Sequence, residues 1–138
     1  MSLYLDASVL VSLFLRDTHT DRAAAMVAAV GSEAIVSDFA RAEFAAVMGR
    51  LQRTGELATP AISTVFSIFD EGTAVVPRKV AVLGIDITDT EAILRRLDLG
   101  LRAPDALHIA IVRRIGATLA TFDNRMADAA RALALRVA

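Results

Sequence analysis

The sequence predicts an α/β fold, a three-layer α/β/α sandwich whose central sheet has four to five mostly parallel strands. Short apolar segments alternate along the chain with longer amphipathic segments, which is typical of successive βαβ units. Glycine, proline or a helix-capping residue stands at most boundaries between these segments. Because the 138 residues contain no repeat and no long linker, we expect one domain spanning residues 1–138.

The N-terminal elements are short and apolar. Residues 3–5 predict a buried strand that ends at an acid, and residues 8–16 are apolar enough to form a packed helix. Residues 19–30 predict a second helix, which Gly31 can end because glycine is common just beyond a helix. Residues 34–36 are again short and apolar, and they predict the second strand.

The middle of the chain contains two helices and a less regular stretch. Ser37 or Asp38 can cap a helix that runs to about Arg53, where a Thr-Gly pair stops it. A Thr-Pro pair opens the following helix, since proline is favoured in the first turn. Across residues 72–87 two glycines and a proline interrupt any period, and we expect a short strand over residues 83–87.

The C-terminal part again alternates between helices and strands. A Thr-Asp-Thr-Glu capping box predicts a helix over residues 88–97. A helix over residues 104–115 opens at a proline and ends at a glycine, and residues 117–120 predict a strand. A helix over residues 124–133 and a final short strand over residues 135–137 complete the predicted fold.

Composition restricts the class of protein. Apolar residues make up 55% of the chain and the mean hydropathy is +0.52, yet no stretch reaches the roughly 18 consecutive apolar residues of a membrane-spanning helix. A well-filled core explains the excess, and an apolar surface that meets a partner is the alternative. The absence of cysteine excludes zinc–thiolate sites and suits a reducing cytoplasm. The net charge of −1 predicts no overall attraction to nucleic acid.

Four acids stand in otherwise apolar segments, namely Asp6, Glu43, Asp105 and Asp123. Acidic side chains are rarely buried unless they are paired or bind a metal ion. Asp6 and Asp123 lie just after predicted strands, and ligands of parallel sheets bind beyond the carboxyl ends of the strands. The other two acids lie on predicted helices that can lean over the same edge. Together the four acids predict a site for a hard divalent cation, and therefore chemistry on phosphates.

Each acid also has a simpler interpretation. Asp6, Asp105 and Asp123 can cap or stabilise the first turn of the helix that follows each of them. Glu43 shares the apolar face of its predicted helix, and it can pair with a distant arginine instead of a metal ion. The presence of all four acids at one predicted edge of the sheet favours the metal site over these separate explanations.

Other side chains near these acids can assist. Ser8 lies two residues after Asp6, so its hydroxyl can hold the carboxylate or a bound water. His108 lies one turn after Asp105 among apolar neighbours, where a histidine is more often a hydrogen-bonded core residue than a catalyst. The cations are nearly all arginine, which suits bidentate phosphate contacts. The candidates for contacts to an RNA backbone are Arg102, Arg50 and Arg53.

Four segments, in this order, resemble the PIN-domain ribonucleases, and specifically the VapC toxins of bacterial toxin–antitoxin pairs. These segments are Tyr4–Leu10, Ser37–Glu43, Leu101–Ala110 and Ala117–Asp123. The third and fourth segments together are the most specific, and the resemblance covers essentially the whole chain. Residues 57–87 match no motif of the family, so the resemblance implies nothing about substrate choice there.

The resemblance implies both a metal site and partners. In this family the acids that match the four candidates form a magnesium or manganese site, and Ser8 and Thr121 occupy the positions of small hydroxyl residues near it. The resemblance also implies a homodimer. It further implies a small antitoxin protein that wraps the toxin and blocks its cleft.

The expected activity is metal-dependent endoribonuclease cleavage of structured RNA, at loops of tRNA or rRNA. A water made more acidic by the ion attacks the scissile phosphorus, and the products carry 5′-phosphate and 3′-hydroxyl ends. Asp6, Asp105 and Asp123 are the expected ligands, direct or through water. Glu43 can bind a second ion or orient the attacking water, so one ion and two ions are both open.

Other functions remain as alternatives at this stage. A PIN nuclease of RNA processing outside any toxin pair, or an inactive PIN fold that only binds a partner, would carry the same residues. Receiver and phosphatase domains also place acids around magnesium. However, Ser8 stands where a phosphatase needs a second acid, and no lysine follows Lys79 as a receiver requires.

Overall fold

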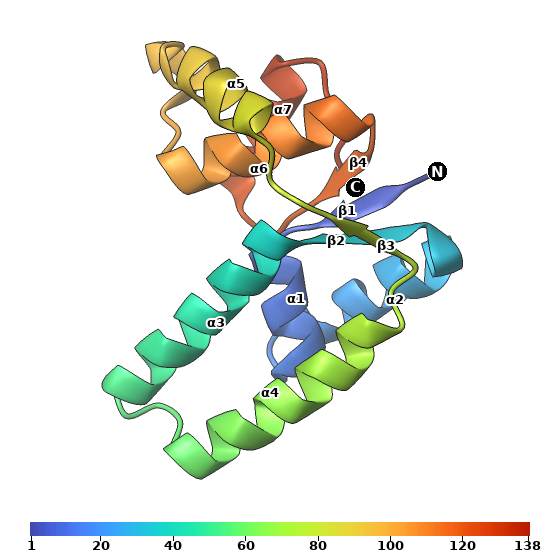
Figure 1. Cartoon of the computed structure of the whole chain (residues 1–138), viewed down its shortest axis with the longest axis vertical. Helices are drawn as coiled ribbons and strands as arrows, with labels where there is room; N and C mark the ends of the chain where they lie inside the picture. Colours follow the sequence, from blue (N-terminus) through green and yellow to red (C-terminus); the bar gives the residue numbers. More distant parts are fainter.

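A computed structural model describes residues 1–138, and its centre is one fully parallel four-stranded sheet (Figure 1). The strand order is β3-β2-β1-β4. The strands are β1 (Leu3–Leu5), β2 (Ala34–Ser37), β3 (Arg78–Val80) and β4 (Thr118–Ala120). The prediction of a parallel sheet is confirmed, and three of the predicted strands are found within one residue of their expected bounds.

Seven α-helices cover the two faces of this sheet. They are α1 (Ala7–Phe14), α2 (Thr20–Val30), α3 (Asp38–Arg53), α4 (Thr59–Ala74), α5 (Gly84–Leu94), α6 (Ala103–Ile115) and α7 (Asn124–Ala132). Figure 1 shows α1 to α4 on one side of the sheet and α5 to α7 on the other, with α3 and α4 projecting as a long pair. The predicted three-layer α/β/α sandwich is therefore confirmed. None of the helices is both long and apolar enough to span a bilayer.

The two faces of the sheet belong to separate hydrophobic clusters, because successive side chains of a strand point to opposite sides. Tyr4 of β1 and Leu119 of β4 pack with the α5–α7 layer. Leu3 and Leu5 of β1 pack with the α1–α4 layer. All four of these side chains are buried. The continuous apolar character of the strands, which predicted burial on both faces, follows from this arrangement.

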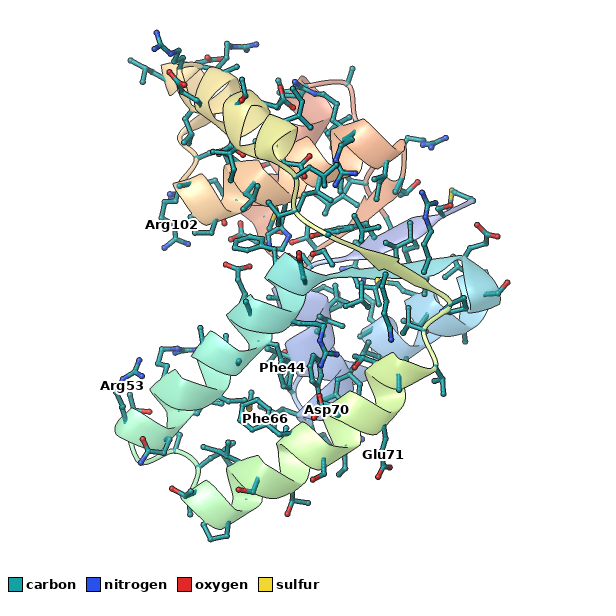
Figure 2. The ribbon with its side chains drawn as sticks, viewed as in Figure 1. Phe44, Arg53, Phe66, Asp70, Glu71 and Arg102 are labelled. Atoms are coloured by element: carbon teal, nitrogen blue, oxygen red, sulfur yellow. The ribbon has the colours of Figure 1, made fainter.

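Aromatic packing holds the α3–α4 pair against α1. The ring of Phe44 stacks on that of Phe69 with centroids 3.9 Å apart, and it meets Phe14 and Phe66 edge-on. Figure 2 shows Phe44 and Phe66 in the space between α3 and α4. Gly72 of α4 lies so close to Phe14 that an added Cβ would stand 2.7 Å from that ring. A glycine is therefore required where α4 crosses α1.

The prediction of a strand over residues 83–87 is wrong, and so is the helix start at residue 88. The third strand lies earlier, at Arg78–Val80, and α5 already begins at Gly84. Asp86 in the first turn of α5 accepts a hydrogen bond from the Leu83 N–H (2.8 Å). It also accepts two hydrogen bonds from Arg114 of α6, at 2.7 and 2.9 Å. This distant arginine stabilises a buried acid at the helix start, which no local pattern reveals.

The two edges of the sheet differ in whether another segment pairs with them. The chain end runs beside β4, where Leu119 pairs in parallel with Val137 through one bridge. The predicted strand over residues 135–137 is thus reduced to that single bridge. The opposite edge is β3, whose Arg78 and Lys79 are exposed.

The order of the strands creates a crevice next to β1. From β1 the chain moves to β2 and then β3 on one side, and it later returns to place β4 on the other side of β1. In open α/β sheets, ligands bind beyond the carboxyl ends of the strands where the strand order reverses. The ends of β1 and β4 therefore define the expected ligand site.

Candidate active site

Asp6 lies at this crevice, directly after β1. The register pairs Leu5 with Ala120, and the Asp6 N–H donates to the Ala120 carbonyl (3.2 Å), so Asp6 stands beside Thr121. The Asp6 carboxylate is buried and accepts three hydrogen bonds. Oδ1 accepts from the Ser8 hydroxyl (2.6 Å) and the Val9 N–H (3.0 Å), and Oδ2 accepts from the Thr121 hydroxyl (2.6 Å). Asp6 is thus both the N-cap of α1 and a fixed acid at the crevice.

Burial dominates the electrostatics of Asp6. It raises the pKa of this carboxyl above the ordinary value, because the charged form loses hydration. Hydrogen bonds from Ser8, Thr121 and the Val9 N–H lower the pKa, as does the nearby His108, but burial outweighs them. A cation at the crevice would restore the charged form, so the chemistry of Asp6 fits a metal ligand.

Thr121 connects Asp6 to Asp123. Its hydroxyl donates to Asp6 and accepts from the Asp123 N–H (3.0 Å). Asp123 caps α7 through Oδ1, which accepts from the Met126 N–H (3.0 Å). The capping interpretation of Asp123 is therefore confirmed, and its Oδ2 accepts no hydrogen bond from the protein. Ser8 and Thr121 both contact Asp6, and their position beside a bound metal ion remains a prediction.

Asp105 stands at the start of α6. Its Oδ2 accepts a long hydrogen bond from the Arg102 N–H (3.4 Å), and the Arg102 Nε lies 3.6 Å from the same oxygen. The side chain of Asp105 is only 10% exposed, whereas that of Arg102 is 75% exposed. Asp105 thus combines a cap-like role with a second oxygen, Oδ1, that no protein group occupies.

Glu43 belongs to a buried chain of hydrogen bonds. Its Oε2 forms a short hydrogen bond with Nε2 of His108, and Nδ1 of His108 lies 2.7 Å from the Tyr4 hydroxyl. The Tyr4 hydroxyl in turn lies 2.7 Å from Oγ of Ser37, the N-cap of α3. Since a carboxylate only accepts, Nε2 of His108 carries the hydrogen toward Glu43. The expectation that His108 is a hydrogen-bonded core residue is confirmed, and the partner of Glu43 is this histidine rather than an arginine.

The four acids do not form a closed set of ligands. No three acidic or histidine side chains are arranged to hold one ion. Asp6 and Asp123 are both hydrogen-bonded to Thr121. Glu43 is linked to Tyr4 of β1 through His108 of α6, and Asp105 lies at the start of the same helix. One oxygen each of Asp123, Asp105 and Glu43 is free of hydrogen bonds, so carboxylate oxygens are available for a hard cation. Coordination by all four acids remains a prediction.

Three neighbouring pockets are lined by two of these acids, Glu43 and Asp123, whereas Asp6 and Asp105 line none of the three. The first, which we call the Phe122 pocket, has a volume of about 420 Å³ and includes Ser8, Arg50 and Asp123 in its lining. The second shares Ala7 and Arg50 with it and adds Glu43 and Arg53. The third shares Asp123 and adds Arg102, Asn124 and Arg125. Figure 2 shows Arg53 towards the end of α3 and Arg102 before α6. The three arginines predicted to contact phosphates therefore all line pockets that contain a candidate acid.

Part of the Phe122 pocket could not be predicted from the sequence. Asp17 and His19 from the turn before α2 line it, together with Phe122 from the loop after β4. These residues are far apart in the sequence and belong to no common motif. The sequence shows that Phe122 precedes Asp123, but no nearby residue indicates which side chains lie opposite its ring.

We expect the Thr121 hydroxyl to contribute to metal binding, and β4 offers a matched control. Thr121→Val removes the hydrogen bond to Asp6, and it should weaken Mn²⁺ binding by about 10- to 100-fold, the usual effect of losing a residue that orients a ligand. Thr118→Val removes a buried hydroxyl that has no hydrogen-bond partner, so it should change neither binding nor stability adversely. Calorimetric titration with Mn²⁺ measures both variants. Equal affinities would show that Thr121 does not support the site.

Comparison with known proteins agrees with this geometry. The PIN domain family matches residues 3–132. Ribonuclease VapC46 of Mycobacterium tuberculosis is 31% identical over 139 residues, covering 99% of this chain and 95% of that protein. Among solved structures, M. tuberculosis VapC20, a Sarcin-Ricin loop cleaving toxin, superposes with a TM-score of 0.71 at 19% identity, covering 93% of this chain and 95% of its own.

A second solved structure shows the same fold over the full length. VapBC2 of Rickettsia felis bound to a promoter DNA fragment matches with a TM-score of 0.73 at 13% identity, covering 100% of this chain and 98% of its own. FitAcB of Neisseria gonorrhoeae matches with a TM-score of 0.72 at 17% identity, covering 98% and 95%. The resemblance of the four sequence segments is thereby confirmed. The chain belongs to the PIN-domain family, within its group of VapC ribonuclease toxins.

Proposed function

We propose that this ribonuclease is a magnesium-dependent endonuclease that cleaves loops of structured RNA. The observation that carries the proposal is the buried Asp6 carboxylate, which Ser8, Val9 and Thr121 hold beyond the ends of β1 and β4. Asp123 is joined to the same network, and arginine-lined pockets adjoin it. Carboxylates supply oxygen ligands for Mg²⁺ or Mn²⁺, and arginines supply contacts for the RNA backbone.

We assign the roles of the acids as follows from their surroundings. Asp6, Asp105 and Asp123 would hold the ion, and Glu43 would orient the attacking water or bind a second ion. When bound, the ion makes a water more acidic and offsets negative charge on the phosphate. His108 keeps the Glu43 carboxylate in one orientation, because its ring is fixed in turn by Tyr4. We expect products with 5′-phosphate and 3′-hydroxyl ends.

The pockets favour an RNA loop as the substrate. Arg50 and Arg53 share one pocket with Glu43, and Arg102 shares another with Asp123. Neither Arg50 nor Arg53 forms a salt bridge. A strand that follows the pockets would therefore meet a cation in the pocket of each of these two acids. VapC20 cleaves the Sarcin-Ricin loop, and loops of rRNA or tRNA are the substrates we propose for this chain.

We also propose that the protein acts as the toxin of a toxin–antitoxin pair, as a homodimer that binds a small antitoxin. Support comes from its fold relatives, which include VapBC2 and a toxin-antitoxin complex from Klebsiella pneumoniae. Large apolar side chains are exposed on α4 and α5 and near them, which suits protein contacts. They are Ile68, Val75, Leu83, Ile85, Ile87 and Leu97.

The test of this function is cleavage of RNA by the purified protein. Total RNA incubated with the protein and Mg²⁺ should yield new 5′-phosphate ends at a small number of loops, and EDTA should abolish them. Sequencing of ligated 5′ ends maps the sites. No metal-dependent cleavage would favour a PIN fold that only binds. Cleavage of RNA without growth inhibition on expression would favour a processing nuclease outside a toxin pair.

A further inference from the structure

The Phe122 pocket differs in chemistry from its two neighbours. Its lining includes Asp123, together with Ser12, Asp17 and His19. Two aromatic rings line it, whereas the pockets on either side contain no aromatic side chain. The Phe122 pocket therefore offers a surface for a planar group next to the acids proposed to hold the metal.

The aromatic surface consists of two rings, His19 and Phe122, that stack and are held in place by further contacts. The ring of His19 lies on that of Phe122 with centroids 4.4 Å apart and an interplanar angle of 15°. The guanidinium of Arg22, one turn further along α2, lies 5.4 Å from the centroid of Phe122. The Phe122 N–H donates to Oγ of Ser8 (2.9 Å), and Ser8 in turn donates to Asp6. The stack is therefore fixed relative to Asp6 by two successive hydrogen bonds.

The polar groups of the pocket suit the edge of a base better than a phosphate. Asp17 accepts hydrogen bonds from the Ser12 hydroxyl (2.7 Å) and the His19 N–H (2.8 Å). Burial acts to raise the pKa of Asp17, but these hydrogen bonds, the charge of the His19 ring and the Thr20 hydroxyl together outweigh it and lower the pKa, so the carboxylate is charged at neutral pH. A carboxylate repels phosphate and accepts hydrogen bonds from the amino and imino groups of bases. Arg50, which also lines the pocket, is the residue suited to phosphate.

We propose that the Phe122 pocket binds one nucleobase of a nucleotide next to the scissile phosphate, stacked on the His19–Phe122 pair and hydrogen-bonded by Asp17. This inference rests on the proposed ribonuclease function and names the form of RNA that the site accepts. A base reaches the pocket only if it is unpaired and unstacked from its neighbours, as in loops. The pocket thus explains how a backbone-binding enzyme would select single-stranded loops over duplex RNA.

The experiment measures binding rather than cleavage, so it does not depend on activity. A labelled RNA of mixed sequence, about ten nucleotides long, is compared in EDTA with an abasic strand of the same length and charge. Wild-type protein should bind the RNA with bases about 5- to 150-fold more tightly, the range for one stacked base. His19→Ala should reduce that ratio towards one and leave affinity for the abasic strand unchanged. His19→Phe should keep the ratio.

Two further variants separate base contacts from phosphate contacts. Arg102→Ala, in the pocket beyond Asp123, should weaken both strands by the same factor, because a phosphate contact does not depend on bases. Asp17→Asn should change the preference among bases while retaining stacking. Quenching of 2-aminopurine fluorescence on binding, present in wild type and lost in His19→Ala, reports the stack directly. His19 is exposed and makes no side-chain cap on α2, so its replacement should not unfold the protein.

The outcomes distinguish this inference from the proposed function. Equal binding of the two strands by wild type, or an unchanged ratio in His19→Ala, would overturn the base pocket even if RNA is cleaved. Equal binding would also be the result if the pocket serves only an antitoxin side chain. A base-dependent ratio that disappears in His19→Ala, in a protein without nuclease activity, would retain the pocket and refute catalysis.

Discussion

Asp6→Asn should lower the rate of metal-dependent RNA cleavage at least about 100-fold, because even residues that only orient a metal ligand contribute 10- to 100-fold. The variant keeps the size of the side chain but removes the charge that the proposed ion requires. The matched control is Asp128→Asn, which changes an exposed acid of α7 paired only with Arg131 (3.2 Å). It should cleave at the wild-type rate. Cleavage by Asp6→Asn at the wild-type rate would refute the assignment of the site.

The melting temperature of Asp6→Asn tests whether its expected loss of activity reflects unfolding. Burial raises the pKa of Asp6 in the folded protein above its unfolded value of about 3.9. A raised pKa contributes stability that is fully present below the unfolded value and is lost as pH rises through the folded value. At neutral pH without metal, the buried charge is therefore unfavourable. Asp6→Asn in EDTA should melt at or above the wild-type temperature at pH 7, with the advantage disappearing in acid.

Phe44→Ala should cost about 3–5 kcal/mol of unfolding free energy, the usual effect of removing a buried phenylalanine. Phe44 is fully buried and contacts three other phenylalanine rings. Its loss would leave a cavity between α3, α4 and α1 that the rings around it cannot fill without leaving their own packing. A domain of this size should lose about 3–5 °C in melting temperature for each kcal/mol. Thermal denaturation followed by circular dichroism measures the change.

The control for Phe44 is its neighbour Phe66, which is only partly buried. Phe66→Ala removes the same number of atoms from the same aromatic cluster, and its cost should be clearly smaller, since part of its ring already contacts water. Equal losses for the two variants would show that the cluster is not centred on Phe44. Both variants should keep Mn²⁺ binding below their melting temperatures, because neither ring lines a pocket that contains a candidate acid.

The fold could largely be predicted because most of its boundaries are decided locally. Ser37 caps α3 by accepting from the Ala40 N–H (3.0 Å), and Gly31 and Gly116 end helices with positive φ. Such signals involve residues within one turn of each other. The start of α5 could not be predicted, because Asp86 is stabilised there by Arg114 of another helix. Where a long-range ion pair decides the boundary, a local capping box is misleading.

Part of the candidate site could also be predicted, because it depends on residues that directly follow strands. Asp6 and Asp123 follow strands, so their positions result from the topology of a parallel sheet. The role of His108 as the partner of Glu43 depends on how α3 and α6 meet above β1. The stack of His19 on Phe122 depends on the path of the turn before α2. Side-chain contacts between distant elements carry no periodic signal, so they appear only in the folded chain.

The structure of the two sheet edges affects how readily the folded protein aggregates at high concentration. At one edge the chain end occupies the hydrogen-bonding groups of β4, since the Leu119 N–H donates to the Arg136 carbonyl and the Ala138 N–H donates to that of Leu119. At the other edge β3 is three residues long, follows a proline and carries Arg78 and Lys79. Short, charged edges resist strand addition by another molecule. Intermolecular β-aggregation of the folded protein is therefore disfavoured on both sides, despite its high apolar content.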